Sequence, residues 1–456
     1  MPDRTLVDKI WDEHVVDDLG DGWALLYADR HLVHDVTSPA AFTMLEERRL
    51  RVHAPHLTFG ATEHSVSIRR GRREDSNPLS ERFVPLMRRN CDAHGFRHYD
   101  IDDPEQGIVH VIAPELGLTL PGTTVVCGDS HTCTNGGLGA LAFGIGTSEL
   151  AHVLATQTVL QRRLANMRIT FDGALAPGVE SKDLILHTIT LLGAGAGTGH
   201  AIEFAGSLVR ELDVEQRMTI CNLAVELGAK VGIVAPDDTT FEYVSARRHA
   251  PRDIAAAVDH WRTFVSDAGA LFDREVTIDG DAVAPQVTWG VSPAHSVDID
   301  GVVPDLPEAY EAMAYMGVEP GQAVEGIPVN WVFIGSCTNG RLSDLEAAAA
   351  VAAGRKVAPG VRALVVPGSR SVARTAEARH LDHIFLDAGF EWGEPGCGLC
   401  PGLGGVKLEA GERCVSTSNR NFMGRQGAGV RTHLAGAATA ALAAVEGVIA
   451  DPRRVR

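Results

Sequence analysis

Residues 330–337, NWVFIGSC, decide the fold class of this chain. An apolar run that ends abruptly in Gly, Ser and Cys predicts a strand that is buried on both faces and followed by a tight turn. Runs of the same kind recur at 107–113 (GIVHVIA), 123–130 (TTVVCGDS), 230–236 (KVGIVAP) and 362–369 (RALVVPGS). Strands without apolar–polar alternation are typical of parallel sheets that helices cover on both faces.

Segments with a helical period of apolar residues separate these predicted strands. They lie at 79–95, 147–163, 181–193, 217–229 and 342–354. The alternation of strands and helices indicates an α/β fold with mostly parallel sheets. Irregular stretches near 164–180 and 278–306 predict linkers, so we expect three α/β domains. The expected ranges are 1–165, 166–295 and 296–456, the third of which carries the clustered cysteines.

The composition of the 456 residues, 45% apolar and 22% charged, is that of a globular protein. Asp and Glu number 59 against 41 Lys and Arg, and the net charge of −18 argues against a nucleic-acid partner. The first residues are charged and amphipathic without a secretory signal, so we expect a cytoplasmic protein. The longest apolar run, 434–450, is too short to span a bilayer, which predicts a buried helix and no membrane partner.

Three of the eight cysteines stand in Gly-rich loops. Cys337 ends the run at 330–337, and Cys397 and Cys400 form a CxxC pair in PGCGLCPG. Three thiolates on tight loops suit an iron–sulfur cluster or zinc, and three protein ligands would leave one coordination position open for substrate.

Two other hypotheses explain the same cysteines. One is a redox-active CxxC pair accompanied by a buried structural thiol at Cys337. The other is a non-catalytic metal-binding module that uses Cys414 or Cys133 as its fourth ligand.

A polar group ends the run at 123–130, where Asp129, Ser130 and His131 come after the apolar residues of a predicted strand. Thr132 stands where a serine nucleophile elbow requires Gly, so a paired acid and imidazole for proton transfer is the better hypothesis. The alternative is a plain loop in which Asp129 caps a helix.

Isolated polar residues are further candidates. His34 lies in a loop of similar character, whereas His110 lies inside an apolar run and has a structural role as its alternative. Glu203 stands between apolar neighbours, and a buried carboxylate is costly unless it is paired or bound to something. The run GAGAGTG at 193–199 is not a dinucleotide fingerprint, because Thr198 replaces the last Gly and no strand precedes it.

The stretch STSNRNFMGRQG at 416–427 places Asn419, Arg420 and Arg425 in one Gly-bounded loop. Guanidinium groups grip carboxylates in a fork geometry, so this loop is a candidate for binding an anionic substrate. An exposed basic loop without such a role is the alternative.

In this order, the motifs CGDSHT, GTGHAIEFAG, GSCTNGR, PGCGLC and STSNRNFMGR resemble the aconitase superfamily, and within it the family of 3-isopropylmalate dehydratase large subunits. The resemblance runs nearly end to end. It implies three α/β/α domains around one [4Fe-4S] cluster per subunit. It also implies that Cys337, Cys397 and Cys400 hold this cluster and that one iron is not ligated by the protein.

The resemblance further implies roles for the remaining candidates. Proton handling at the substrate hydroxyl falls to His110, Asp129 and His131, and contact with the iron-bound oxygen falls to Glu203. The residues implied to bind substrate or orient the cluster are His34, Ser130, Asn419, Arg420 and Arg425.

The implied activity is that of a hydro-lyase, which isomerises 2-isopropylmalate and 3-isopropylmalate by dehydration and rehydration in leucine biosynthesis. In this family the serine that acts as the carbon base lies in a fourth, swivelling domain, which is a separate small subunit. We therefore expect a small-subunit partner, a small dicarboxylate 2-hydroxy acid as substrate, and no activity for this chain alone.

Three departures from the family pattern concern substrate choice. Glu63-His64 stands where relatives carry Asp-His, Cys133 and Asn135 replace the usual residues after the SHT motif, and the stretch from Pro401 also differs. The role of His64 stays open. An isomerase for another 2-alkylmalate, or for a malate of secondary metabolism, is therefore the near alternative.

Overall fold

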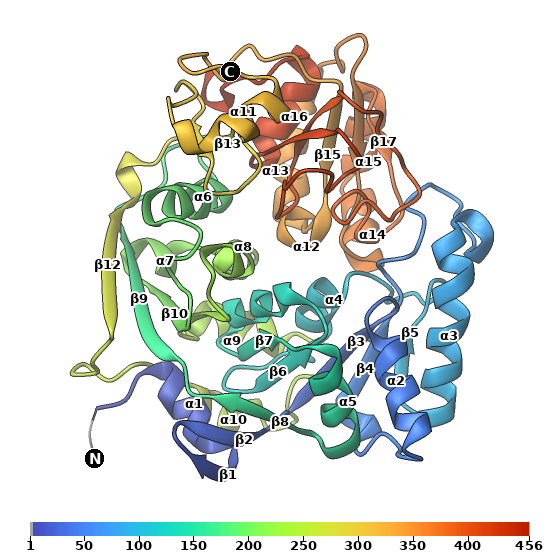
Figure 1. Ribbon diagram of the computed structural model, residues 1–456, viewed down its shortest axis with the longest axis vertical. Coiled ribbons are helices and arrows are strands. Elements are labelled where there is room, and N and C mark those ends of the chain that lie inside the picture. The colour runs from blue at the N-terminus through green and yellow to red at the C-terminus, as the bar shows by residue number, and fades with distance from the viewer. Residues whose placement is uncertain (1–2, 456) are drawn as a thin grey trace. The chain divides into compact units, whose positions relative to one another are not determined.

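A computed structural model describes residues 3–455 (Figure 1). Contacts between Cα atoms group the chain into two compact units, each of which is assembled from three chain segments. Unit 1 comprises 3–63, Glu81–Gly173 and Gly195–Ile278, and unit 2 comprises His64–Ser80, Ala174–Ala194 and 279–455. The division into three domains at 165/166 and 295/296 stays a prediction.

A five-stranded sheet with the order β5-β4-β3-β6-β7 forms one part of unit 1, and every neighbouring pair in it is parallel. Its strands are β3 (Arg30–His34), β4 (Thr58–Ala61), β5 (Arg97–Tyr99), β6 (Thr124–Cys127) and β7 (Leu141–Gly144). The helices of this region are α2 (Ser38–Glu47), α3 (Pro78–His94), α4 (Val109–Leu116) and α5 (Thr147–Thr156). All four residues of β6 are buried, as expected for a strand covered on both faces.

A four-stranded sheet with the order β11-β10-β9-β12 forms a second part of unit 1. Its strands are β9 (Ala165–Asp172), β10 (His200–Ala205), β11 (Val231–Val234) and β12 (Arg274–Asp279). The helices between them are α7 (Ser207–Glu211), α8 (Val214–Asn222), α9 (Asp238–Ser245) and α10 (Ile254–Trp261). One apolar core joins residues of both sheets, including Val126 of β6 and Val231 of β11.

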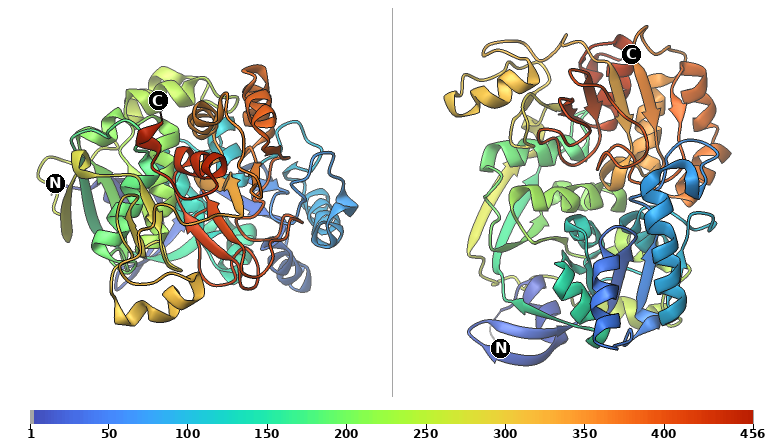
Figure 2. Two further views of the ribbon diagram at one scale, coloured as in Figure 1. Left: turned by 90° about the horizontal axis from the view of Figure 1, so that it is seen from above. Right: turned by 45° about the vertical axis from the view of Figure 1, so that its right-hand side comes forward.

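An antiparallel ribbon completes unit 1. It pairs β1 (Val15–Gly20) with β2 (Trp23–Tyr27), and β2 with β8 (Thr158–Arg162). Helix α1 (Leu6–His14) contacts β2 of this ribbon, and β1 and β2 are blue near the N-terminus in Figure 2.

Unit 2 is built on a five-stranded parallel sheet with the order β17-β16-β15-β18-β19. Its strands are β15 (Trp331–Ile334), β16 (Arg362–Val365), β17 (Glu391–Trp392), β18 (Arg413–Ser416) and β19 (Arg431–Leu434). Helices α13 (Leu342–Ala352) and α16 (Ala437–Glu446) pack against each other, and α16 also contacts β15. An apolar cluster that includes Phe333 and Leu399 forms the core beneath the cysteine loop.

The remaining elements of unit 2 are shorter or lie around this sheet. They are α6 (Ser181–Leu192), β13 (Gln286–Thr288), β14 (Ser296–Asp298), α11 (Tyr310–Met316), α12 (Ser336–Asn339), α14 (Arg370–Ala378) and α15 (Leu381–Ala388). Helix α6 contacts both strands of the β13-β14 hairpin.

The α/β class with mostly parallel sheets is confirmed, and four of the five predicted strands are β6, β11, β15 and β16. The strand predicted at 107–113 is wrong, because these residues lead into helix α4. A fully buried apolar run carries no period that separates a helix from a strand. The helix predicted at 147–163 ends early, since Gln157 adopts a left-handed φ of 59° and β8 begins after it.

The buried helix predicted at 434–450 is α16, which is buried along nearly its whole length. Across residues 3–455, no helix combines the length and the apolar character that a membrane span requires.

Candidate active site

The three predicted ligand cysteines follow the carboxyl ends of parallel strands in unit 2. Cys337 comes three residues after β15, and Cys397 and Cys400 lie in the loop after β17. Asn419 comes three residues after β18, the neighbour of β15 in the sheet. Parallel strands end at the same edge of a sheet, which is where open α/β folds place their ligands.

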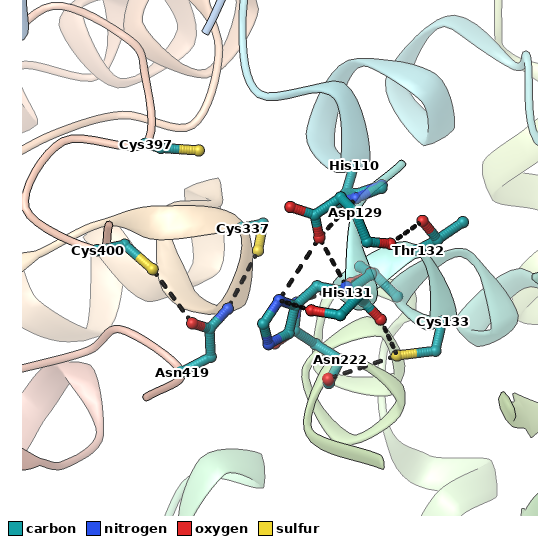
Figure 3. Close-up of polar contacts among 12 residues, drawn as sticks. His110, Asp129, His131, Thr132, Cys133, Asn222, Cys337, Cys397, Cys400 and Asn419 are labelled. Atoms are coloured by element: carbon teal, nitrogen blue, oxygen red, sulfur yellow. Dashed lines mark hydrogen bonds and ion pairs between the residues drawn. The ribbon is translucent and has the colours of Figure 1, made fainter. Parts of the chain in front are cut away.

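Asn419 connects two of these thiols, as Figure 3 shows. Its Nδ2 donates to Cys337 Sγ at 3.5 Å, and its Oδ1 accepts from Cys400 Sγ at 3.1 Å. The side chains of Cys337, Cys397 and Cys400 are 5–6% exposed, and none of them forms a disulfide. The structure therefore brings the amide predicted to orient the cluster against two of the three predicted ligands.

The backbone of both cysteine loops adopts left-handed conformations. Ser336, directly before Cys337, has a φ of 76°, and Gly398, directly after Cys397, has a φ of 60°. A Cβ on Gly398 would lie 3.1 Å from Ile68 Cδ1 and 3.2 Å from Phe333 Cε2, so glycine is needed here for both conformation and space. A non-glycine residue with a left-handed backbone conformation, such as Ser336, is strained. Such strain persists at sites that the surrounding structure holds firmly.

Two further groups lie beside the thiols. Arg425 donates from Nη2 towards Cys400 Sγ at 3.9 Å, and its guanidinium also lies 5.3 Å from the centre of the Phe422 ring. His64 Nδ1 is 3.8 Å from Cys397 Sγ. The histidine whose role the sequence left open therefore lies next to a predicted ligand. Arg420 lies in the same loop as Arg425, and both are partly exposed, as groups that bind an anion from solvent need to be.

Cys414 and Cys133, the alternative fourth ligands, occupy different surroundings. Cys414 is fully buried inside strand β18, where burial raises the pKa of its thiol. Cys133 belongs to unit 1, where its thiol donates to the carbonyl of Asn222 at 3.5 Å. A buried thiol that contacts a backbone carbonyl is typical of a structural cysteine.

In unit 1, one carboxylate serves two imidazoles. Asp129 follows β6 and caps the 3₁₀ helix η3 (Ser130–Leu138) by accepting from the backbone N–H of His131 at 2.7 Å. Its Oδ1 lies 3.4 Å from His110 Nε2 and 3.5 Å from His131 Nδ1. Capping and catalytic positioning are thus compatible roles for Asp129, and the predicted acid–imidazole group is assembled (Figure 3).

Asn135 fixes the tautomer of His110. Its Nδ2 donates to the carbonyl of Thr132 at 3.0 Å, which sets the orientation of the amide, and the same nitrogen lies 3.4 Å from His110 Nδ1. His110 Nδ1 therefore accepts, and the ring proton of the neutral imidazole sits on Nε2, facing Asp129.

Glu226 is a candidate residue that sequence reasoning missed. It lies in the 3₁₀ helix η4 (Leu223–Leu227) after α8, and its Oε1 is 3.1 Å from His131 Nε2. Both side chains are nearly buried, with 5% exposure for His131 and 11% for Glu226. A carboxylate inside the apolar segment NLAVELGAK was the available signal, on the same grounds that singled out Glu203.

Glu203 itself is held by other partners. It lies in β10, where its carboxylate accepts from Ser266 Oγ at 2.5 Å and from Arg168 Nη2 at 3.3 Å. Burial raises its pKa, and the hydrogen bonds of Ser266 and Arg168 counteract part of that effect.

The two residues predicted to contact substrate in unit 1 stand at strand ends. His34 is the last residue of β3 and is buried, and its Nε2 is 2.9 Å from Thr37 Oγ1. Ser130 follows β6, with its Oγ 3.4 Å from His131 Nδ1. Because β3 and β6 are parallel neighbours, both residues lie at the same edge of the sheet as Asp129.

Comparison with known proteins identifies the family of this chain. The family model described as aconitase family (aconitate hydratase) matches residues 8–447, and the chain belongs to the aconitase family. A curated relative from Bradyrhizobium diazoefficiens, 3-isopropylmalate dehydratase large subunit 1, is 56% identical over 99% of this chain and 96% of its own length. The crystal structure of aconitase X from Thermococcus kodakaraensis in its holo-form aligns with a TM-score of 0.47 at 12% identity, over 87% of this chain and 84% of that one.

Membership in this family makes the chain a hydro-lyase and implies a [4Fe-4S] cluster. The residues present fit such a group. Three buried thiols without disulfides lie in loops at one sheet edge, and an amide N–H and a guanidinium N–H are directed at two of the sulfurs. Thiolate ligands in a dry pocket, with hydrogen bonds to sulfur, are what proteins use to hold and tune iron–sulfur clusters.

Proposed function

We propose that this chain is the large subunit of a 3-isopropylmalate dehydratase, which interconverts 2-isopropylmalate and 3-isopropylmalate in leucine biosynthesis. The observation that carries the proposal is the 56% identity, over 99% of the chain, to a relative named for that subunit. The buried thiols around Asn419 support the proposal from the structural side.

The proposed cofactor is one [4Fe-4S] cluster per chain, held by Cys337, Cys397 and Cys400, with one iron that no protein residue ligates. When bound, such a cluster supplies a Lewis acid for the hydroxyl and carboxylate oxygens of the substrate. Asn419 orients the sulfurs through the two contacts that it makes with Cys337 and Cys400.

Unit 1 handles the proton that accompanies loss of the hydroxyl. The Glu226 carboxylate lies 3.1 Å from His131 Nε2 and orients this imidazole, which is a proposed group for proton transfer. Asp129 orients both His131 and His110 through contacts of 3.4–3.5 Å. Glu226 adds a carboxylate to the proton-handling group, and Glu203 keeps the separate role that the family resemblance implies.

The substrate class follows from the charges of the loop at 416–427 and the proposed activity. A dicarboxylate needs cationic groups in a chain whose net charge is −18, and Arg420 and Arg425 supply two of them. His34 and Ser130 are the proposed substrate contacts in unit 1.

The proposed partner is a small subunit that carries the swivel domain with the serine base. The words large subunit in the name of the B. diazoefficiens relative support this partner. We further propose that the complex is cytoplasmic, and that the chain alone does not turn over substrate.

The test mixes the anaerobically reconstituted chain with candidate small subunits and follows the unsaturated intermediate by ultraviolet absorbance. Isopropylmalate, citrate and methylmalate are offered separately, and a Cys397→Ser chain is the matched control. We expect turnover of isopropylmalate only, and only with a small subunit. Turnover of methylmalate in preference to isopropylmalate would replace the proposed substrate by another 2-alkylmalate, and turnover by the chain alone would remove the need for a partner.

A further inference from the structure

Lys182 is a fully buried lysine of unit 2 that the proposed chemistry does not use. It lies in the first turn of α6, with 0% of its surface exposed. An ammonium group is almost never buried in this way unless other groups compensate it. The contacts of its Nζ therefore indicate what it serves.

The Lys182 ammonium donates to two consecutive backbone carbonyls. Its Nζ donates to the carbonyl of Thr417 and, at 2.7 Å, to that of Ser418. These are the two residues directly before Asn419, whose amide contacts Cys337 and Cys400. The lysine thus holds the backbone from which the cluster-orienting amide projects.

The same loop is fixed on its other side by the strand that leads to Cys337. The N–H of Gly335 donates to Thr417 Oγ1 at 2.8 Å, and that hydroxyl donates to the carbonyl of Gly335 at 3.0 Å. The backbone N–H of Thr417 donates to the carbonyl of Phe333 at 2.9 Å. Lys182 and the strand that leads to Cys337 therefore both hold the backbone at Thr417.

Asp344 extends this arrangement to the loop of Cys337. Burial lowers the pKa of Lys182 to about 7, and the charges of Asp344 and Cys400 counteract that effect. Asp344 in turn accepts from Asn339 Nδ2 at 2.8 Å and from the backbone N–H of Arg341 at 2.9 Å. Asn339 is the last residue of α12, the short helix that contains Cys337.

We propose that Lys182 is a positioning residue for the cluster site, which holds the Thr417–Ser418 backbone so that Asn419 orients the sulfurs of Cys337 and Cys400. This inference rests on the cluster of the proposed function. It assigns a role in cluster retention to a residue of α6, whose chain segment is remote in sequence from every proposed ligand.

The test measures how fast reconstituted protein, as the full chain, releases iron to a chelator under anaerobic conditions. Lys182→Met keeps the length of the side chain and removes the donor. The matched control is Lys356→Met, because Lys356 also donates to a backbone carbonyl, that of Asp387, but is exposed. We expect Lys182→Met to release iron roughly 10- to 100-fold faster than wild type, as for other residues that support metal ligands, and Lys356→Met to be unchanged.

A double-mutant cycle with Asn419→Ala separates positioning from a general structural role. If Lys182 acts through Asn419, the double variant releases iron no faster than the faster single variant, and the electron paramagnetic resonance spectrum of the reduced cluster changes in the same way in both single variants. Independent effects that multiply in the double variant would overturn the inference.

The remaining outcomes are also decisive. A wild-type chain that takes up no iron and sulfide overturns the proposed function, and the inference with it. A loaded wild type with unchanged release in Lys182→Met overturns the inference alone. If Lys182→Met does not fold, Lys182→Gln takes its place in the cycle, and failure of both to fold while Asn419→Ala folds shows that Lys182 serves the core instead.

Discussion

Replacing Glu226 by Gln tests the proton-handling group of unit 1. The substitution keeps the shape of the side chain but removes the negative charge 3.1 Å from His131 Nε2. The pair is nearly buried, with 5% and 11% exposure, so solvent screens it little. A hydrogen bond to a charged group is worth about 1.5–3 kcal/mol. If that contact holds His131 in position for proton transfer, its loss lowers kcat roughly 10- to 150-fold, at about 1.4 kcal/mol per factor of ten.

The assay compares kcat and KM of the reconstituted complex, with iron content matched between variants. Glu149→Gln is the matched control, because Glu149 is a carboxylate of the same unit whose partners are the backbone N–H of Gly146 and the side-chain amide of Gln161. We expect Glu149→Gln to keep kcat. Wild-type kcat in Glu226→Gln, or a loss of kcat in a folded and loaded Glu149→Gln, would refute the assignment.

Two further predictions concern stability. Gly398→Ala should lower the melting temperature more than Gly411→Ala. Both substitutions add about 1–2 kcal/mol of strain from the left-handed backbone conformation, but only position 398 has side chains within 3.2 Å of the new Cβ. Equal losses of melting temperature would contradict the packing argument. Burial lowers the pKa of His14, but its 2.6 Å contact with Asp29 outweighs this and raises the net pKa, while the pKa of Asp29 is lowered. The stabilisation by this ion pair is therefore complete near pH 5 and is lost as the pH rises from 6.5 through the raised pKa of His14. The difference in melting temperature between wild type and His14→Gln should therefore narrow from pH 5 to pH 9. A constant difference would exclude the ion pair as the cause of the stabilisation.

The sheets could be predicted because each buried parallel strand is a short apolar run that can be recognised from its own residues. The run at 330–337 contains β15, and the small polar residues after it form the turn that carries Cys337. The run at 107–113 is also mostly apolar, yet it leads into helix α4 with His110 in its first turn. Burial on all sides removes the polar face from which a helical period is read, so composition alone could not separate the two.

The site was predictable where its residues cluster in short motifs at strand ends. Asp129 and His131 are two residues apart, and the sequence places them together before any fold is known. Glu226 stands 95 residues from His131 and meets it only because η4 packs on η3. The role of Lys182 could not be predicted from the sequence for the same reason, since its partners at 417 and 418 lie 235 and 236 residues away.

The most direct test of the central claim is the iron and sulfide content of the anaerobically reconstituted chain, measured for wild type, Cys397→Ser and Cys414→Ala. Cys414→Ala is the matched control, because Cys414 is also a buried thiol of unit 2 but lies inside strand β18. The account predicts about four iron and four sulfide per chain in wild type and Cys414→Ala, and a large loss in Cys397→Ser. Wild-type content in Cys397→Ser, or zinc without sulfide in the wild-type chain, would contradict it.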